Sequence, residues 1–325
     1  MNVTPHGLGF SLPRNYSPEE LPDLVNHLFG IPDFNPEYHL ASTGRSGYAT
    51  RYTVKTALGA ELFSILTDGR GDFLQNQTHI DISGLAFEDT ASNPMNLDLY
   101  HIAREVIAMR GWGTEMHSAI DEFSGLLPWK TILKLSLSRN WKDRIINTLC
   151  RYKTDKSTGE KRQTGPVLVG NHVSGSLYFG ERESDTSICI YQKGLAEGVK
   201  FTWLRVEIRW RNRAAVTDIL KRLAAGESLA CITAGAIKYN LRFVVPGEKR
   251  KGGRDTCKWW ADFLGDAEVL KLTRKRDPLY KSPFQIPVND KQLVEKYLMK
   301  KLAGPQAIEI EDLMETILTE RRMKL

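Results

Sequence analysis

Two side chains with a nucleophilic or cationic group, Tyr191 and Lys193, lie two residues apart in the segment TSICIYQK. Alternation along a strand would place both on the polar face, opposite Ile188 and Ile190. A phenol has a pKa of about 10, so it attacks as phenolate only when a metal, a cation or a base favours that form. Lys193 could help in this way. The pattern alone does not separate Tyr191 from Tyr178 on the preceding strand as the nucleophile.

A second segment, Trp203–Arg211, carries one carboxylate among arginines. Alternation puts Arg205, Glu207 and Arg209 on one face of a strand and four apolar side chains on the other. One interpretation is an exposed face on which the arginines neutralise the glutamate. The other is a carboxylate that holds a divalent cation while the arginines bind phosphates.

A third segment, TEMHSAIDEF, places His117 and Asp121 on one face on either side of the small Ala119. An imidazole and a carboxylate can bind Mg²⁺ or Mn²⁺ together with a carboxylate from elsewhere. A single histidine is, however, more often a surface or core residue than a ligand. Between the hairpin strands, Arg182 and Ser184 in the turn GERESD suit a DNA phosphate, as they also suit any polar turn.

The elements that must position these residues indicate an α+β protein. Six prolines break the first 40 residues, which we expect to be a lead-in with one helix after Ser17. Glycine-bounded alternation predicts antiparallel strands, and apolar residues at helical spacing predict helices. The predicted strands are Tyr48–Ser83, Thr114–Phe123, the hairpin of Ser174–Lys193 and Trp203–Arg211; the predicted helices are Asn96–Arg110, Pro128–Cys150 and Ala214–Leu223.

The strands THIDISG and LRVEIRW both carry a carboxylate between β-branched residues, which favours a duplicated module.

A basic stretch near 247–255 marks a boundary between two regions of the chain. We therefore predict two regions, a catalytic domain over residues 1–247 with its N-terminal lead-in, and a basic, mainly helical C-terminal region over residues 248–325. Helices are expected there near Cys257–Leu264, Asp290–Leu302 and Ile308–Arg322.

Composition narrows the classes of function. The 325 residues are 41% hydrophobic and 26% charged, as in an ordinary globular protein. The net charge of +6 comes with clustered lysines and arginines, which favours a polyanionic partner such as nucleic acid. Four dispersed cysteines without a CxxC pair indicate reduced thiols and a cytoplasmic location. No apolar run approaches the length of a membrane span.

In combination, these segments resemble the replication initiation factor (Rep_trans) family, the tyrosine-dependent rolling-circle replication initiators of plasmids, filamentous phages and integrative elements. The resemblance lies in SLYFGERESDTSICIYQKG, LRVEIRW, HIDISG and MHSAIDEF, in the family's order over roughly Tyr48–Leu223. It implies that Tyr191 is the nucleophile, that Asp121 and Glu207 bind the metal, and that Arg182, Ser184 and Lys193 serve the DNA backbone. His117 replaces a usual Asp and is kept as a ligand.

The function expected from this resemblance is site-specific nicking and closing of DNA that starts rolling-circle replication. Its partners would be a double-stranded origin, a single-stranded nick site, a host helicase and polymerase, and a second copy in a homodimer, with Mg²⁺ or Mn²⁺ as cofactor. One alternative is a conjugative relaxase of an integrative element. Others are a non-catalytic origin-binding regulator and a metal-dependent phosphodiesterase that uses water.

Overall fold

The computed structural model describes residues 2–272 apart from short gaps at 35, 42, 72–73, 89–94, 138–140, 144–151, 155–160, 164–165, 170–172, 174, 181–183, 200 and 248–252. The strands are β1 (Asn2–Leu12), β2 (His39–Leu40), β3 (Tyr48–Lys55), β4 (Glu61–Gly69), β5 (Thr78–Ser83), β6 (Trp112–Glu122), β7 (Trp141–Asp143), β8 (Tyr152–Thr154), β9 (Lys161–Gln163), β10 (Val167–Val169), β11 (Ser176–Phe179), β12 (Thr186–Gln192), β13 (Leu204–Trp210) and β14 (Leu241–Phe243). The α-helices are α1 (Leu21–Phe29), α2 (Leu99–Ala108), α3 (Trp129–Leu137), α4 (Lys193–Ala196), α5 (Arg213–Ala224), α6 (Leu229–Asn240) and α7 (Lys258–Leu264), and η1 (Pro18–Glu20) and η2 (Gly84–Phe87) are 3₁₀ helices.

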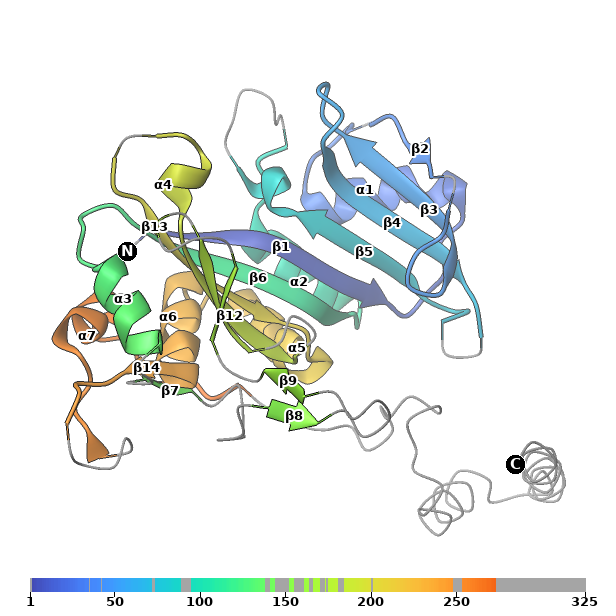
Figure 1. The fold of residues 1–325 in the computed structure, drawn as a ribbon. Coiled ribbons are helices and arrows are strands. Elements are labelled where there is room, and N and C mark those ends of the chain that lie inside the picture. Colours follow the sequence, from blue (N-terminus) through green and yellow to red (C-terminus); the bar gives the residue numbers. More distant parts are fainter. Residues whose placement is uncertain are drawn as a thin grey trace, which may run out of the picture. The chain divides into compact units, whose positions relative to one another are not determined.

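Ten strands form one antiparallel sheet in the order β10-β11-β12-β13-β6-β1-β5-β4-β3-β2 (Figure 1). Packed helices accompany the sheet, so the predicted α+β class with an antiparallel core is confirmed. β13 pairs with both β12 and β6, so it lies between the hairpin and the strand that carries His117 and Asp121.

The sheet consists of two halves with the same order of elements. The first half runs β1, α1, β3, β4, β5 and α2, and the second runs β6, α3, β11, β12, β13 and α5. In each half, the last strand lies between the first strand and the third one. The two first strands, β1 and β6, pair antiparallel and join the halves. This topology agrees with the duplicated module that the echo of THIDISG and LRVEIRW favours.

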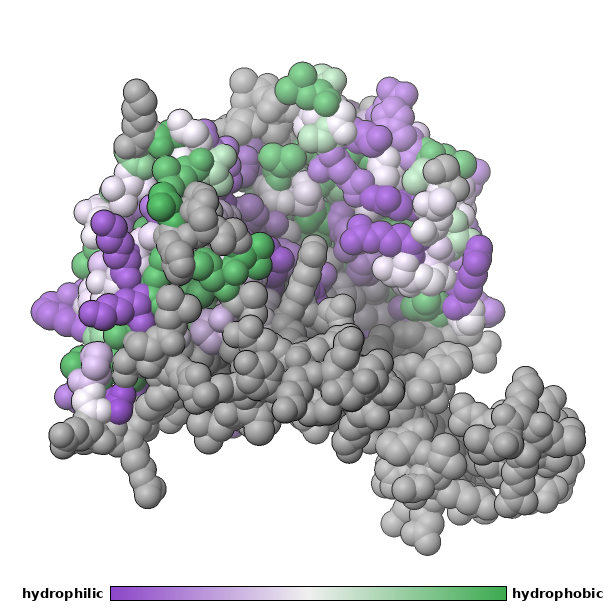
Figure 2. Space-filling model, in the orientation of Figure 1, coloured by the Kyte–Doolittle hydropathy of each residue, from purple (hydrophilic) through white to green (hydrophobic). Residues whose placement is uncertain are grey.

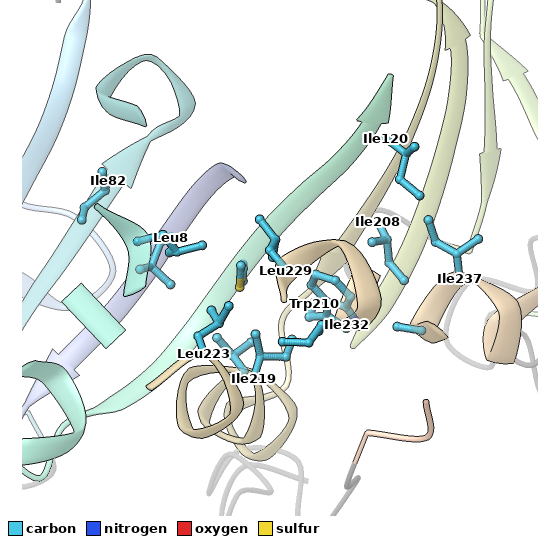
Figure 3. Close-up of a cluster of buried hydrophobic side chains, with 14 of the residues drawn as sticks. Leu8, Ile82, Ile120, Ile208, Trp210, Ile219, Leu223, Leu229, Ile232 and Ile237 are labelled. Atoms are coloured by element: carbon cyan, nitrogen blue, oxygen red, sulfur yellow. The ribbon is translucent and has the colours of Figure 1, made fainter. Parts of the chain in front are cut away.

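The core lies between one face of the sheet and the helices α2, α5 and α6 (Figure 1). Side-chain oxygens of Asp98, Asn212 and Ser228 accept hydrogen bonds from free backbone N–H groups at the starts of these helices. Figure 3 shows Leu8, Ile120 and Ile208 of three adjacent strands facing the apolar side chains of α5 and α6. Because successive side chains of a strand point to opposite faces, the residues between these apolar ones lie on the face away from the helices.

The N-terminal segment differs from its prediction as a lead-in, because β1 is a central strand between β5 and β6. Its interior glycines and Pro5 hide the strand pattern in the sequence, although Leu8, Phe10 and Leu12 alternate into the core. A Cβ atom at Gly9 would lie 2.8 Å from Thr114 Oγ1 and 2.9 Å from Asp81 Oδ1, so a larger residue there would displace these side chains.

One further prediction needs correction. The helix expected over Pro128–Cys150 is α3, which ends at Leu137, and Trp141–Asp143 is a strand that pairs with β14. The chain divides into two compact units, Met1–Lys275 and Arg276–Leu325. Within the first unit, α7 contacts α6 and Trp260 is buried in the core. The division into a catalytic domain and a C-terminal region near residue 247 stays a prediction. The other helices predicted after residue 275 lie outside the described residues. Within the described part of the chain, no helix has the length and apolar character needed to span a bilayer.

Candidate active site

The face of the sheet opposite the core helices carries a polar cluster across β12, β13 and β6. Antiparallel register places directly opposed residues on the same face, so the side chains form rows across the strands. One row contains Tyr191, Arg205 and Asp121, the next contains Cys189, Glu207 and Ala119, and the third contains Ser187, Arg209 and His117. The three segments singled out in the sequence therefore meet on one surface.

Tyr191 stands on β12 opposite Ser176 on one side and Arg205 on the other. Burial raises the pKa of its phenol to about 12, and the charge of Glu207 adds to this rise. The charge of Arg205 and a hydrogen bond from it act in the opposite direction. The phenol is therefore neutral near pH 7, and its attack on phosphorus needs a base or an additional cation.

Lys193 does not share the strand with Tyr191. The chain leaves the sheet after Gln192, and Lys193 is the first residue of α4, where its ammonium group pairs with Glu197. Its Nζ lies 5.7 Å from the centroid of the Trp203 ring. The cation that faces the phenol of Tyr191 is consequently Arg205.

Tyr178, the other tyrosine of this face, stands opposite Cys189 on β12. The neighbouring thiol raises the pKa of this phenol most, and burial raises it further. The charge of Arg209 acts on Tyr178 and lowers this pKa. Arg205, the arginine that lies opposite Tyr191, also donates a hydrogen bond to that phenol, so the geometry favours Tyr191 as the nucleophile.

Asp121 and Arg205 form a buried ion pair. Arg205 donates from Nε to Asp121 Oδ1 at 2.7 Å and from Nη2 to Oδ2 at 2.6 Å, and both residues are under a tenth exposed. Trp203 Nε1 also donates to Asp121 Oδ1 at 2.7 Å. Both oxygens of this carboxylate are thus used within the protein, which fixes the arginine beside Tyr191.

The predicted metal ligands His117, Asp121 and Glu207 do not all come together. His117 and Asp121 are four residues apart on an extended strand, a span of about 13 Å. Glu207 lies opposite the intervening Ala119, and its Oε1 is 3.9 Å from His117 Nδ1. The described residues contain no group of three or more His, Cys, Asp or Glu side chains arranged to hold a metal ion.

The pair of His117 and Glu207 nevertheless has features of a partial cation site. His117 Nε2 is 2.6 Å from Glu115 Oε1, which leaves Nδ1 on the side of Glu207. Metal-binding histidines commonly have their second nitrogen bonded to a carboxylate in this way. A hard cation held by few protein ligands keeps waters and takes oxygens from a substrate phosphate. These two residues offer ligand types that suit a hard cation, and Oε1 of Glu207 also accepts a hydrogen bond from Arg209 Nε.

Arginines surround the carboxylates of this region. Arg209 Nε donates to Glu207 Oε1 at 2.7 Å, and Arg211 Nε donates to Glu115 Oε1 at 2.9 Å. In contrast to the buried Arg205, the side chains of Arg209 and Arg211 are both 24% exposed. Of the four residues predicted to contact DNA, Arg209 therefore keeps access to solvent and Arg205 does not. Ser184 is half-buried just before β12, and Arg182 lies outside the described residues.

His6 is the site residue that the sequence did not suggest. It occupies a bulge in β1 between Pro5 and Gly7, and its Nε2 contacts Arg205 Nη1. Burial lowers the pKa of His6, and the charge of Arg205 lowers it further. The signal in the sequence would have been a histidine between proline and glycine inside an otherwise alternating strand, which is typical of a bulge that re-aims a side chain.

The chain belongs to the replication initiation factor family, whose model matches residues 116–283, just over half of the chain. A curated relative, described as "Putative DNA relaxase NicK" of Bacillus subtilis (strain 168), is 29% identical over 119 residues. That match spans 33% of this chain and 34% of the relative. Among solved structures, the rolling circle replication initiator protein from Geobacillus stearothermophilus is similar with a TM-score of 0.61 and 21% identity. The likeness covers 84% of this chain and all of that one, and it shows a common fold.

Proposed function

We propose that this protein nicks and closes DNA at a replication origin by transesterification on Tyr191. The observation that carries the proposal is the row of Tyr191, Arg205 and Asp121, in which a phenol faces an arginine that a buried carboxylate holds in place. This row lies in the stretch that matches the family model. The resemblance of the motifs to tyrosine-dependent initiators supports the same residue as nucleophile.

In the proposed reaction, the phenolic oxygen of Tyr191 attacks the scissile phosphorus. The bond from phosphorus to the 3′ oxygen breaks, the phenol loses its proton, and the 3′ oxygen gains one. The products are a 5′-phosphotyrosine link and a free 3′-OH, which a host polymerase can extend after a helicase opens the duplex. Because one ester replaces another, the reverse attack closes the strand.

Arg205 contributes to this step by its position. Its charge and hydrogen bond favour the phenolate of Tyr191, whereas burial and Glu207 oppose that form. Arg209, partly exposed beside Glu207, is placed to contact a non-bridging phosphate oxygen. His117 and Glu207 would hold Mg²⁺ or Mn²⁺, which would neutralise charge that develops on the phosphate.

The test is the formation of a covalent adduct. A supercoiled plasmid that carries candidate origin DNA is incubated with the full chain and Mn²⁺, and denaturing gels report DNA-linked protein. We expect an adduct with the wild type and a loss of at least about 10³-fold in Tyr191→Phe, the scale found when a nucleophile is removed. Tyr178→Phe, the matched control on the neighbouring strand, should retain the adduct. An adduct that persists in Tyr191→Phe would refute the assignment.

A relaxase of an integrative element is the second candidate, favoured by the match to NicK. Both functions begin with the same covalent adduct, so they differ in the process that follows its formation. Replication of an origin plasmid in a cell extract would indicate an initiator, and transfer of that plasmid in a mating assay would indicate a relaxase. DNA binding without any adduct would indicate an origin-binding regulator, and hydrolysis without a trapped adduct would indicate a phosphodiesterase.

A further inference from the structure

Three aromatic rings gather where β6 ends and β13 begins, and we refer to Phe123, Phe201 and Trp203 as the aromatic cluster. The Phe201 and Trp203 rings are stacked, with centroids 6.2 Å apart and planes 11° apart. Phe123 lies 5.4 Å from Trp203 and 6.2 Å from Phe201 by ring centroids. Residues far apart in the sequence thus build one aromatic surface.

This surface is open to solvent. Phe123 is 47% exposed and Phe201 is 57% exposed, and in the described part of the chain they are the only phenylalanines among the exposed large hydrophobic side chains. Figure 2 shows hydrophobic surface in the region of α4, where the chain turns towards β13. Exposed aromatic residues that cluster in this way mark interaction sites more often than isolated apolar residues do.

The aromatic cluster adjoins the candidate active site through Trp203. The indole Nε1 donates to Asp121 Oδ1 at 2.7 Å, the same oxygen that accepts from Arg205 Nε. The Lys193 ammonium and the Arg205 guanidinium each lie 5.7 Å from the Trp203 ring centroid. The ring is therefore fixed in orientation, next to the row that contains Tyr191.

The residues around the aromatic cluster indicate which kind of molecule could bind to it. Ion pairs border the aromatic cluster, Lys193 with Glu197 and Arg205 with Asp121, and they disfavour a purely apolar peptide as the occupant. The DNA strand proposed to bind at Tyr191 would pass directly beside the rings. Nucleobases present flat π faces that stack on aromatic side chains with little dependence on sequence. In a duplex, each base face is covered by its neighbours, so only unpaired bases are free to stack on the aromatic cluster.

We propose that the aromatic cluster stacks unpaired nucleobases that flank the scissile phosphate and thereby holds the nick site in single-stranded form. This inference rests on the proposed nicking function. Stacking of one base on an aromatic side chain contributes about 1–3 kcal/mol, or roughly 5- to 150-fold in affinity. The aromatic cluster would thus make the single strand the preferred substrate.

The experiment compares two probes in the Tyr191→Phe background, which binds without reacting. One is a fluorescein-labelled oligonucleotide of thymidines, and the other has the same length and phosphates but abasic sites at its centre. We expect at least about 5-fold tighter binding of the base-bearing strand by anisotropy. The added changes Phe123→Ala and Phe201→Ala should remove that difference and leave the affinity for the abasic strand unchanged. Leu195→Ala, an exposed apolar residue of α4, is the matched control.

A second measurement uses the protein with the aromatic cluster intact. An oligonucleotide with 2-aminopurine at successive positions should lose fluorescence at one or two positions on binding, because stacking on an aromatic ring quenches it. Equal affinity for the two probes, or no quenching at any position, would overturn the inference. Base-dependent binding without any adduct in the wild type would refute the nicking function alone, and an adduct without base-dependent binding would refute the stacking alone.

Discussion

The two halves of the sheet share their topology, but among the described strand pairs only the second half places a tyrosine directly opposite an arginine. Asp81 of β5 lies opposite Gly9 and Ser64, as Glu207 of β13 lies opposite Ala119 and Cys189. Two residues earlier on each strand, the halves diverge. His79 lies opposite Ser11 and Leu66 in the first half, where Arg205 lies opposite Asp121 and Tyr191 in the second. Leu66 thus occupies the position of the proposed nucleophile.

The first half uses its polar residues to stabilise the fold. Ser11 Oγ lies 2.9 Å from His79 Nδ1, and His79 Nε2 lies 3.0 Å from Asp81 Oδ1. This order of groups resembles a hydrolase triad, but Ser11 is only 3% exposed and cannot meet a substrate. A carboxylate on the last strand is therefore common to both halves, and the neighbouring residues on either side decide whether it can serve chemistry.

The largest contrast is expected between the two equivalent carboxylates. Glu207→Gln keeps the shape of the side chain and removes the charge beside His117 and Arg209, so adduct formation should fall on the order of 10³-fold. Asp81→Asn, the same change in the first half, should leave the rate within about twofold. Rates come from the covalent-adduct assay under single-turnover conditions. Comparable losses in the two variants would show that the first half also contributes to the reaction.

A contrast in stability is expected at the positions opposite Arg205 and His79. Asp121→Ala leaves the buried guanidinium of Arg205 unpaired and should lower the free energy of unfolding by about 3–5 kcal/mol. Ser11→Ala removes a neutral hydrogen bond to His79 and should cost about 1 kcal/mol. Urea unfolding followed by circular dichroism measures both.

A double variant provides the control for the buried pair. Replacing both partners, Asp121→Leu with Arg205→Met, should be less destabilising than Asp121→Ala, because no buried charge remains unpaired. Equal costs for Asp121→Ala and Ser11→Ala would contradict the special position of this pair.

The faces of the second-half strands could be predicted from sequence because alternation with a period of two is a local property. Leu204, Val206 and Ile208 are buried in the core, and Glu207 lies on the other face as predicted. The sequence also constrains which strands are neighbours, because residues that form one site must lie on adjacent strands.

The participation of β1 could not be predicted in the same way. Pro5 and Gly7 interrupt its alternation, and the bulge that turns His6 towards Arg205 depends on pairing with β6, more than a hundred residues later. The partners of Asp121 and Lys193 were missed for a related reason. Arg205 and Trp203 satisfy Asp121 across strands, and the chain turns into α4 just before Lys193.

Metal affinity should distinguish the histidines of the two halves. His117→Ala should abolish Mn²⁺ binding measured by calorimetry, and His79→Ala should leave it unchanged. Glu115→Gln keeps His117 but weakens the bond that orients its ring, so Mn²⁺ affinity should fall about tenfold. Removal of the metal with EDTA should stop adduct formation. Unchanged affinity in His117→Ala would remove this histidine from the cation site.

The smallest contrast concerns the pH dependence that Asp81 gives to the first half. Burial by itself would raise the pKa of this carboxyl, but the hydrogen bond from His79 and the charges of His79 and Arg45 outweigh it and lower the pKa. A lowered pKa in the folded state means that the carboxylate stabilises the fold above its ordinary pKa, and that this contribution is lost as the pH falls below that value. The difference in unfolding free energy between the wild type and Asp81→Asn should therefore shrink from pH 6 towards pH 3, by on the order of 1 kcal/mol. Urea unfolding across that pH range measures the difference in unfolding free energy. Ser64→Ala on the adjacent strand is the control, because it changes no titratable group. A difference that stays constant with pH would mean that Asp81 acts through packing and not through its charge.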